Sequence, residues 1–438
     1  MKPRQAQATA PHPTSQNRPA SRKAVLSGAS GNALETFDFS VYAYLAVILG
    51  AEFFPSADRT VSLLASFAAF GVGFLARPAG AVVFGRLGDR RGRRQVLLVT
   101  LLLMGGATLG IALLPGYSTI GVLAPALLVL LRLLQGFSAG GEITTSAAYL
   151  VEWAPRGRRG FFGSFMQAGA VAGLLLGSLS VATCYSVLGE SQMQEWGWRI
   201  PFVIAGCLAP LAYLLRRTTE ETPAFSDLVE AQADESSRPA RPAMGRFRPV
   251  WRAFVFTMFW SVGFYFFLTY MPTFLQREFG VSASQGTWIS SLAMVVHMAL
   301  IPVCGALSDR FGRKPVLLTG CLAFVVVPVP LFGLLSDEPP FVVLFLVVAA
   351  VGAMLALYTG PAAATMAEFF PTSSRTSGMA IGYNVASAVF GGFTPYIATW
   401  LVASTGARIA PVYYVAGAAL IAAGWLALQR ETAKADLA

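Results

Sequence analysis

The sequence predicts an all-α membrane protein whose twelve transmembrane helices form two pseudo-symmetric six-helix halves. The chain has 438 residues, a mean hydropathy of +0.60, 55% hydrophobic residues and only 12% charged residues. This composition excludes a soluble globular protein. Apolar stretches of about twenty residues or more recur along the chain, and each is long enough to cross a bilayer as a helix. A loop motif that occurs once in each half indicates that the membrane unit is duplicated.

The predicted spans follow one another along the chain with one long polar interruption. They lie at about 25–50, 60–85, 95–115, 119–151, 160–187, 199–216, 251–277, 285–307, 315–336, 340–369, 378–404 and 408–428. Residues 1–23 are polar, which predicts a disordered cytoplasmic tail and not a signal peptide. The polar segment 218–248 is predicted to be a cytoplasmic loop between an N-terminal bundle at 24–217 and a C-terminal bundle at 249–430, which a cytoplasmic tail at 431–438 follows.

The distribution of basic residues predicts the topology. The net charge is +10, and 26 of the 32 Lys and Arg residues fall on one side when the termini and the even-numbered loops are assigned to it. Four fall on the opposite side and two lie within spans. Because positively charged loops stay inside, both termini are expected in the cytoplasm, with the protein in the cell inner membrane. This reading of the basic charge argues against a nucleic-acid partner.

The duplicated motif lies between the second and third spans of each half. It reads GRLGDRRGRR at 85–94 and GALSDRFGRK at 305–314. Its glycines permit a tight turn, and its Asp can accept hydrogen bonds from a neighbouring helix N-terminus or pair with an Arg. Three residues of each copy are therefore predicted to latch the cytoplasmic side in one state of the protein: Asp89, Arg90 and Arg93, and Asp309, Arg310 and Arg313.

Five ionisable residues lie well inside predicted spans: Glu35, Asp38, Arg77, Arg132 and Glu142. Each would cost about 2.5–3.5 kcal/mol if it faced lipid, so we expect them to face one another or a water-filled cavity. Intramembrane charge of this kind predicts a functional site, and the three carboxyl groups are the candidate proton-coupling groups. The five charges sum to −1 when all are ionised.

Helical spacing places several of these groups on shared faces. Glu35 and Asp38 are three residues apart on the first span, and Arg132 and Gln135 repeat this spacing on the fourth. One shared site is therefore expected, with these candidate substrate-binding residues: Asn32, Arg77, Arg132, Gln135, Tyr265, Tyr383 and Asn384. Two alternatives stay open. Arg132 can simply staple two helices by pairing with Asp38 or Glu35, and Arg77 can serve an interface or a gate.

Electrostatics indicates how a proton and an anion could move together. Protonation of Glu35 or Asp38 would remove negative charge and free Arg132 to bind a carboxylate through its planar fork. Proton and anion would then favour each other's binding by the same free energy. A site with a charge of −1 also suits a zwitterion such as betaine, which is the alternative class of substrate.

The two loop motifs resemble the signature of the major facilitator superfamily, and the similarity covers nearly the whole chain after residue 24. Four further segments resemble the metabolite:proton symporter family: GNALETFDF at 31–39, RLLQGFSAGGE at 132–142, WGWRIPF at 196–202 and FGGFTP at 390–395. The resemblance implies the major facilitator fold, in which the first and fourth spans of each half line a central cavity. It also implies a substrate such as citrate, 2-oxoglutarate, shikimate, proline or betaine. Thr36 and Phe37 stand where many relatives have Trp-Tyr or Trp-Phe, a pattern closer to citrate-type members.

The sequence thus predicts a secondary transporter that imports an organic-acid anion, a di- or tricarboxylate such as citrate or 2-oxoglutarate, with protons. Osmolyte carriers of the betaine and proline type often bear C-terminal heptads, which this chain lacks, so the organic acid is favoured. A sensor with the same fold that does not transport is the alternative of another class. The sequence contains no Walker loop, metal-ligand cluster or His-containing triad, so neither an enzyme nor a cofactor is expected. We expect a monomer in the lipid bilayer.

Overall fold

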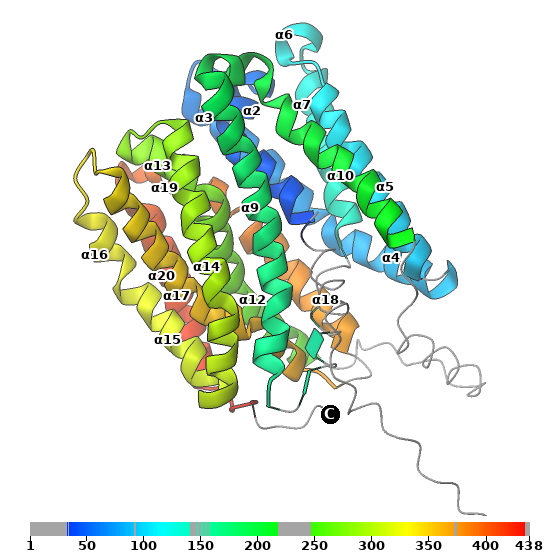
Figure 1. The fold of residues 1–438 in the computed structure, drawn as a ribbon, viewed down its shortest axis with the longest axis vertical. Helices are drawn as coiled ribbons and strands as arrows, with labels where there is room; N and C mark the ends of the chain where they lie inside the picture. The colour runs from blue at the N-terminus through cyan, green and yellow to red at the C-terminus, as the bar shows by residue number, and fades with distance from the viewer. Residues whose placement is uncertain are drawn as a thin grey trace, which may run out of the picture.

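A computed structural model shows long helices packed side by side (Figure 1). The structure describes residues 33, 35–91, 93–140, 147, 150–151, 154–155, 157–217, 247–371 and 375–433. Within these ranges the side chains at 85–86, 88–98, 209–217, 247 and 376–377 are not described. Five predicted site residues therefore have side chains outside the described residues: Asn32, Asp89, Arg90, Arg93 and Glu142.

Helices occupy all six predicted spans before residue 218. The first span is a bent pair, Glu35–Tyr44 and α2 (Ala46–Phe53), whose axes meet at 66°. α3 (Arg59–Leu75) and α4 (Arg77–Arg91) share the second, and α5 (Arg93–Leu113) forms the third. α6 (Tyr117–Ile120) and α7 (Leu123–Ser138) lie in the fourth, α9 (Arg159–Gln192) and the π-helical η2 (Met193–Gly197) in the fifth, and α10 (Arg199–Arg217) in the sixth.

The predicted fourth span, at about 119–151, contains more than one helix. A turn separates α6 from α7, because Gly121 adopts a left-handed backbone conformation with φ +58° that interrupts the helix. α7 then ends at Ser138, and Ala139 and Gly140 form a turn.

Helices also occupy the six predicted spans after residue 246. The seventh comprises α12 (Phe247–Tyr265), the π-helical η4 (Phe266–Tyr270) and α13 (Met271–Phe279). α14 (Ala283–Phe311) forms the eighth, α15 (Arg313–Val326) with α16 (Pro328–Gly333) the ninth, and α17 (Phe341–Glu368) the tenth. α18 (Arg375–Ala386), the π-helical η6 (Ser387–Gly391) and α19 (Thr394–Thr405) form the eleventh, and α20 (Ala410–Ala427) the twelfth.

Length and composition agree with a protein that crosses a membrane many times. Among the described residues, eight helices are long and apolar enough to cross a bilayer, or nine if the bent first pair counts as one span. Three shorter apolar helices lie in the third, fourth and sixth predicted spans: Val99–Leu113, Leu123–Ser138 and Arg199–Leu208. The all-α membrane fold and the positions of its predicted spans are confirmed.

Close helix contacts set the positions of the charged side chains. A Cβ atom on Gly136 of α7 would lie only 1.6 Å from the carbonyl oxygen of Gly73 on α3, so no larger residue fits there. This contact draws α7 against the end of α3, just before α4 begins at Arg77. It therefore brings the helices that carry Arg77 and Arg132 close together.

A second close contact joins helices from the two parts of the sequence. α9 and α14 run side by side over much of their length (Figure 1). A Cβ atom on Gly305 of α14 would lie 2.5 Å from the carbonyl oxygen of Gly160 on α9. Farther along the same pair of helices, the hydroxyl groups of Ser178 and Ser291 are 2.5 Å apart and hydrogen-bonded.

Candidate functional site

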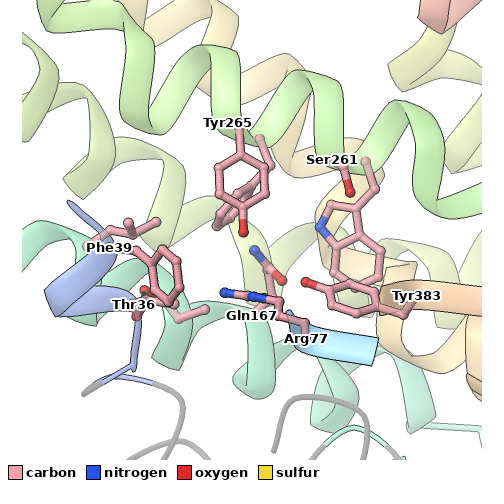
Figure 2. Close-up of a pocket in the computed structure, with 11 residues that line it drawn as sticks. Thr36, Phe39, Arg77, Gln167, Ser261, Tyr265 and Tyr383 are labelled. Carbon is pink, nitrogen blue, oxygen red and sulfur yellow. Dashed lines mark hydrogen bonds between the residues drawn. The ribbon is translucent and has the colours of Figure 1, made fainter. Parts of the chain in front are cut away.

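A small cavity lies between the first helix, α4, α9, α12 and α18 (Figure 2). Its volume of about 20 Å³ is enough for a water molecule but too small for a metabolite. The lining combines aromatic, aliphatic and polar side chains: Thr36, Phe39, Arg77, Gln167, Ala170, Leu174, Trp260, Ser261, Phe264, Tyr265 and Tyr383. Three predicted substrate-binding residues, Arg77, Tyr265 and Tyr383, are among them.

Arg77 is the cationic residue of this lining, and it forms an ion pair with Glu35. Nη2 of Arg77 lies 2.9 Å from Oε1 of Glu35, and both side chains are only 2% exposed. We call these two residues the cavity pair. Among the described residues, Nε and Nη1 of Arg77 have no hydrogen-bond acceptor. The hydroxyl groups of Tyr265 and Tyr383 point toward this guanidinium from the other side of the cavity (Figure 2).

Asp38 belongs to a second buried network. Its Oδ1 accepts a hydrogen bond of 2.8 Å from Thr108, and its Oδ2 accepts one of 2.6 Å from Nε2 of Gln135. Nη1 of Arg132 donates to Oε1 of Gln135 at 2.9 Å and lies 3.9 Å from Asp38 Oδ2. We call Asp38 and Arg132 the sealed pair, because both are buried and neither lines the cavity.

The expectation of one shared site for Glu35, Asp38 and Arg132 was therefore wrong in this conformation. The structure has two ion pairs, and Arg132 takes the alternative of pairing with Asp38. Arg132 does not line the cavity because aromatic rings cover it: its Cζ lies 4.3 Å from the Tyr42 ring centroid. Gln135 is likewise occupied by Asp38 and Arg132.

Aromatic rings connect the two pairs. Cζ of Arg77 lies 4.6 Å from the centroid of the Phe39 ring, and Cζ of Arg132 lies 4.8 Å from the same centroid. Phe74 contacts only the first of these guanidinium groups, at 4.2 Å, and Phe70 only the second, at 5.2 Å. Phe39, Phe70 and Phe74 also contact one another, with centroid separations of 5.0–6.1 Å. We call them the three-ring cluster.

Asn384, the remaining predicted substrate-binding residue whose side chain is described, is outside the cavity lining. Its Nδ2 donates a hydrogen bond of 2.8 Å to the carbonyl oxygen of Gly140, at the end of α7. In this conformation Asn384 therefore ties α18 to the fourth span.

Several lining residues were not predicted from the sequence. Gln167 is the one with a strong polar signal, because it is an amide in the apolar fifth span. Ser261 and Tyr265 are four residues apart on α12, so their helical spacing also could have revealed a shared face. Trp260 and Phe264 carry no such signal, because aromatic residues are common throughout this chain.

The second copy of the duplicated motif joins α14 to α9 at its end of the bundle. Asp309 of α14 accepts hydrogen bonds of 2.8 Å from the backbone N–H groups of Gly160 and Phe161, at the N-terminus of α9. Arg313 pairs with Asp309 at 2.8 Å and with Glu368 at 3.2 Å. This is the arrangement expected of a latch. Arg310 lies exposed beside the Phe311 ring.

Other contacts join the two parts of the chain farther toward the opposite end of the bundle. The hydroxyl group of Tyr44 donates to the carbonyl oxygen of Leu268. That carbonyl is free because the residue four positions later is Pro272, which has no N–H group. Glu190 of α9 accepts a hydrogen bond of 3.3 Å from the backbone N–H of Ala283, at the N-terminus of α14.

Metal binding finds no support in the described part of the chain. No group of three or more His, Cys, Asp or Glu side chains that could hold an ion occurs there.

Comparison with known proteins gives matches over nearly the whole chain. The family model described as Major Facilitator Superfamily matches residues 28–281 and 261–437. The proline/betaine transporter of Escherichia coli K12 is 38% identical over 426 residues, which cover 95% of this chain and 85% of the relative. The citrate-proton symporter of Salmonella typhi is 37% identical and is covered to 94%, as is this chain.

A third relative and a solved structure also match this chain over most of its length. The alpha-ketoglutarate permease of Escherichia coli K12 is 38% identical, with 91% of each chain covered. A crystal structure of D-xylose-proton symporter superposes with a TM-score of 0.74 over 94% of this chain and 99% of the other, at 20% identity. At that identity the superposition supports the fold alone.

Proposed function

Because the chain belongs to the major facilitator superfamily, we propose that it is a secondary active transporter that carries a small carboxylate-bearing solute together with protons. The observation that carries this proposal is the cavity pair. Among the described residues, a buried guanidinium with unsatisfied donors faces a cavity between the two parts of the chain, and the Glu35 carboxylate pairs with it. Such an arrangement is suited to alternating access around a central site.

The chemistry of coupling follows from the charge of this pair. While Glu35 is ionised it holds Arg77, and a solute carboxylate entering the cavity would meet a negative charge. Protonation of Glu35 removes that charge and frees the guanidinium to bind the solute carboxylate. Proton and solute then stabilise each other's binding by the same free energy, which is the thermodynamic basis of symport.

The cavity lining favours a solute of the betaine or proline type. Five of its residues are aromatic: Phe39, Trp260, Phe264, Tyr265 and Tyr383. Aromatic faces attract a quaternary or secondary ammonium group, while Arg77 takes the carboxylate at the other end of the zwitterion. The similarity to a proline/betaine transporter supports this assignment.

A di- or tricarboxylate, as expected from the sequence, is the second candidate. The similarity to a citrate-proton symporter and an alpha-ketoglutarate permease is of equal strength and supports it. One observation in the structure also favours it: Arg132 is a second buried cation with unsatisfied nitrogens, and it contacts the same Phe39 ring as Arg77. Opening of the sealed pair would supply a second carboxylate partner.

Orientation and organisation belong to the same proposal. The basic loops favour a protein of the cytoplasmic membrane with both termini and the motif-bearing end inside the cell. Residues 24–217 and 249–430 would then be the two rocking bundles, and 218–248 the loop between them. The Asp309–Arg313 contact would latch the cytoplasmic side.

Uptake into proteoliposomes under an imposed inward proton gradient tests the proposal. Labelled betaine, proline, citrate and 2-oxoglutarate are supplied separately, with and without a protonophore. Gradient-driven accumulation of betaine or proline is expected, and accumulation of citrate or 2-oxoglutarate instead would establish the second candidate. Uptake of none of the four, or uptake that the protonophore leaves unchanged, would contradict proton-coupled carriage of these carboxylates.

A further inference from the structure

The Phe39 side chain contacts the arginine of each ion pair. Within the three-ring cluster it is the member that contacts both guanidinium groups, at 4.6 Å from Arg77 and 4.8 Å from Arg132. It is 2% exposed, so the contacts are shielded from water. Cation–π contacts strengthen when they are desolvated.

The carboxylates of both pairs lie on the same helix as this ring. Glu35 is four residues before Phe39, on the same face, and Asp38 is the residue immediately before it. Movement of the Phe39 ring or of this helical turn therefore changes the geometry of both pairs at once. A buried, close-packed environment transmits such a change and does not absorb it.

On the premise of the proposed function, we propose that Phe39 is a positioning residue that couples the sealed pair to solute binding at the cavity pair. When Arg77 leaves Glu35 for a solute carboxylate, the Phe39 ring loses or shifts one of its two cations. The ring then settles against Arg132, whose own position depends on Asp38, Gln135 and Thr108. The state of the sealed pair thereby sets part of the affinity at the cavity, although neither Asp38 nor Arg132 lines it.

A double-mutant cycle tests this coupling directly. Thr108→Val removes one hydrogen bond from Asp38 without touching the cavity. Binding of betaine, or of whichever probe the uptake assay shows to be carried, is measured by calorimetry in purified protein. The wild type and Thr108→Val are compared first, and then the same pair is compared in a Phe39→Leu background. Leu keeps an apolar side chain in the lining but removes the ring, so Phe39→Leu is expected to weaken binding by itself. The comparison therefore uses the ratio of the dissociation constants with and without Thr108→Val, taken separately in each background.

Matched controls come from the other members of the three-ring cluster. Of the two guanidinium groups, Phe74 contacts only that of Arg77 and Phe70 only that of Arg132. Phe74→Leu and Phe70→Leu therefore each remove one cation–π contact and leave the Phe39 ring in contact with both arginines. Phe39→Tyr restores a ring and serves as the rescue variant.

The expected result is a Thr108→Val effect on the dissociation constant of about fivefold or more in the wild-type background, the lower end of the range typical of coupling between sites. In the Phe39→Leu background the effect should vanish, whereas it should persist with Phe74→Leu and return with Phe39→Tyr. An equal Thr108→Val effect with and without the Phe39 ring would overturn the proposal, and so would the absence of any effect in the wild-type background. Failure of the proposed function is distinguishable, because the wild type would then bind and carry none of the probes.

Discussion

The cavity pair and the sealed pair use the same chemistry in two different settings. Glu35 and Asp38 are three residues apart on one helix, and each lies beside an arginine from a neighbouring helix. Arg77 contacts Glu35 directly at 2.9 Å, whereas Arg132 lies 3.9 Å from Asp38 and reaches it through Gln135. Asp38 also accepts a hydrogen bond from Thr108.

This difference in contacts suits the two pairs to different roles, one to the exchange of one carboxylate for another and the other to holding the first helix in place. A direct ion pair beside a cavity can trade one carboxylate for another when its own carboxylate is protonated. A carboxylate that also accepts hydrogen bonds from neutral side chains is held in place even when its arginine shifts, because its remaining partners satisfy it. We therefore assign proton–solute exchange to the cavity pair and the anchoring of the first helix to the sealed pair.

The largest effect is expected from Arg77→Gln. The change removes the cavity cation and leaves Glu35 buried without its ion-pair partner. Loss of a charge-assisted carboxylate contact of about 3 kcal/mol predicts a fall of about 100-fold or more in uptake of the carried solute. Initial uptake rates in proteoliposomes measure it, with protein folding checked by thermal unfolding. Uptake within a factor of two of the wild type would remove Arg77 from the site.

Glu35→Gln and Asp38→Asn contrast the two carboxylates. Glu35→Gln should abolish gradient-driven accumulation but leave exchange of labelled for unlabelled solute. The neutral Gln side chain cannot hold Arg77 in an ion pair, so solute binding no longer requires protonation of residue 35. Asp38→Asn should retain driven accumulation, reduced several-fold, because Asn still accepts one of the hydrogen bonds that Asp38 receives. Accumulation and exchange are measured side by side. The reverse pattern, in which only Asp38→Asn loses accumulation, would show that Asp38 of the sealed pair, and not Glu35, carries the coupled proton.

Arg132→Gln should act mainly on stability. It strands Asp38 without a cation inside the bundle, and breaking a buried pair in this way costs about 3–5 kcal/mol. A marked drop in the midpoint of thermal unfolding in detergent is expected, with driven uptake per folded molecule less affected than in Arg77→Gln. A variant as stable as the wild type that no longer binds solute would make Arg132 a ligand and favour a di- or tricarboxylate.

Thr108→Val gives the smallest effect of the series. The substitution removes the buried hydrogen bond to Asp38 and the hydroxyl oxygen that accepts a second bond from Gln135, while Gln135 still donates to the other carboxylate oxygen of Asp38. A loss of about 1 kcal/mol in the free energy of unfolding is expected. Thermal unfolding of the wild type and the variant measures it. A loss comparable to that of Arg132→Gln would show that the sealed pair depends chiefly on Thr108.

Much of the fold could be predicted from the sequence, because apolar stretches of membrane-spanning length are a strong local signal. All predicted spans contain helix, and the resemblance to the superfamily, drawn from the duplicated loop motif, is confirmed. The break before α7 could not be predicted from hydropathy, because it depends on the positive φ of Gly121. The relatives do not decide between an organic acid and an osmolyte, because they include both types at 37–38% identity.

The site could be predicted in its residue types but not in its pairing. Buried charge marked Glu35, Asp38, Arg77 and Arg132, but spacing along one helix does not show which arginine each carboxylate meets. That choice depends on how α4 and α7 approach the first helix, and the close contact of Gly136 with Gly73, which sets α7 against α3, is a tertiary feature that spacing along one helix does not show. Phe39 could not be singled out either, because it is one of 32 phenylalanines and its role depends on what surrounds it.

The central claim is that a solute carboxylate takes Arg77 only when Glu35 is protonated. Proton uptake on solute binding tests it most directly, by calorimetry of the purified protein in buffers that differ in ionisation enthalpy. With betaine as the first probe, and the other carried solutes in turn, the account predicts uptake of about one proton per bound solute in the wild type and almost none in Glu35→Gln. Equal proton uptake in the two proteins, or none in the wild type, would contradict it.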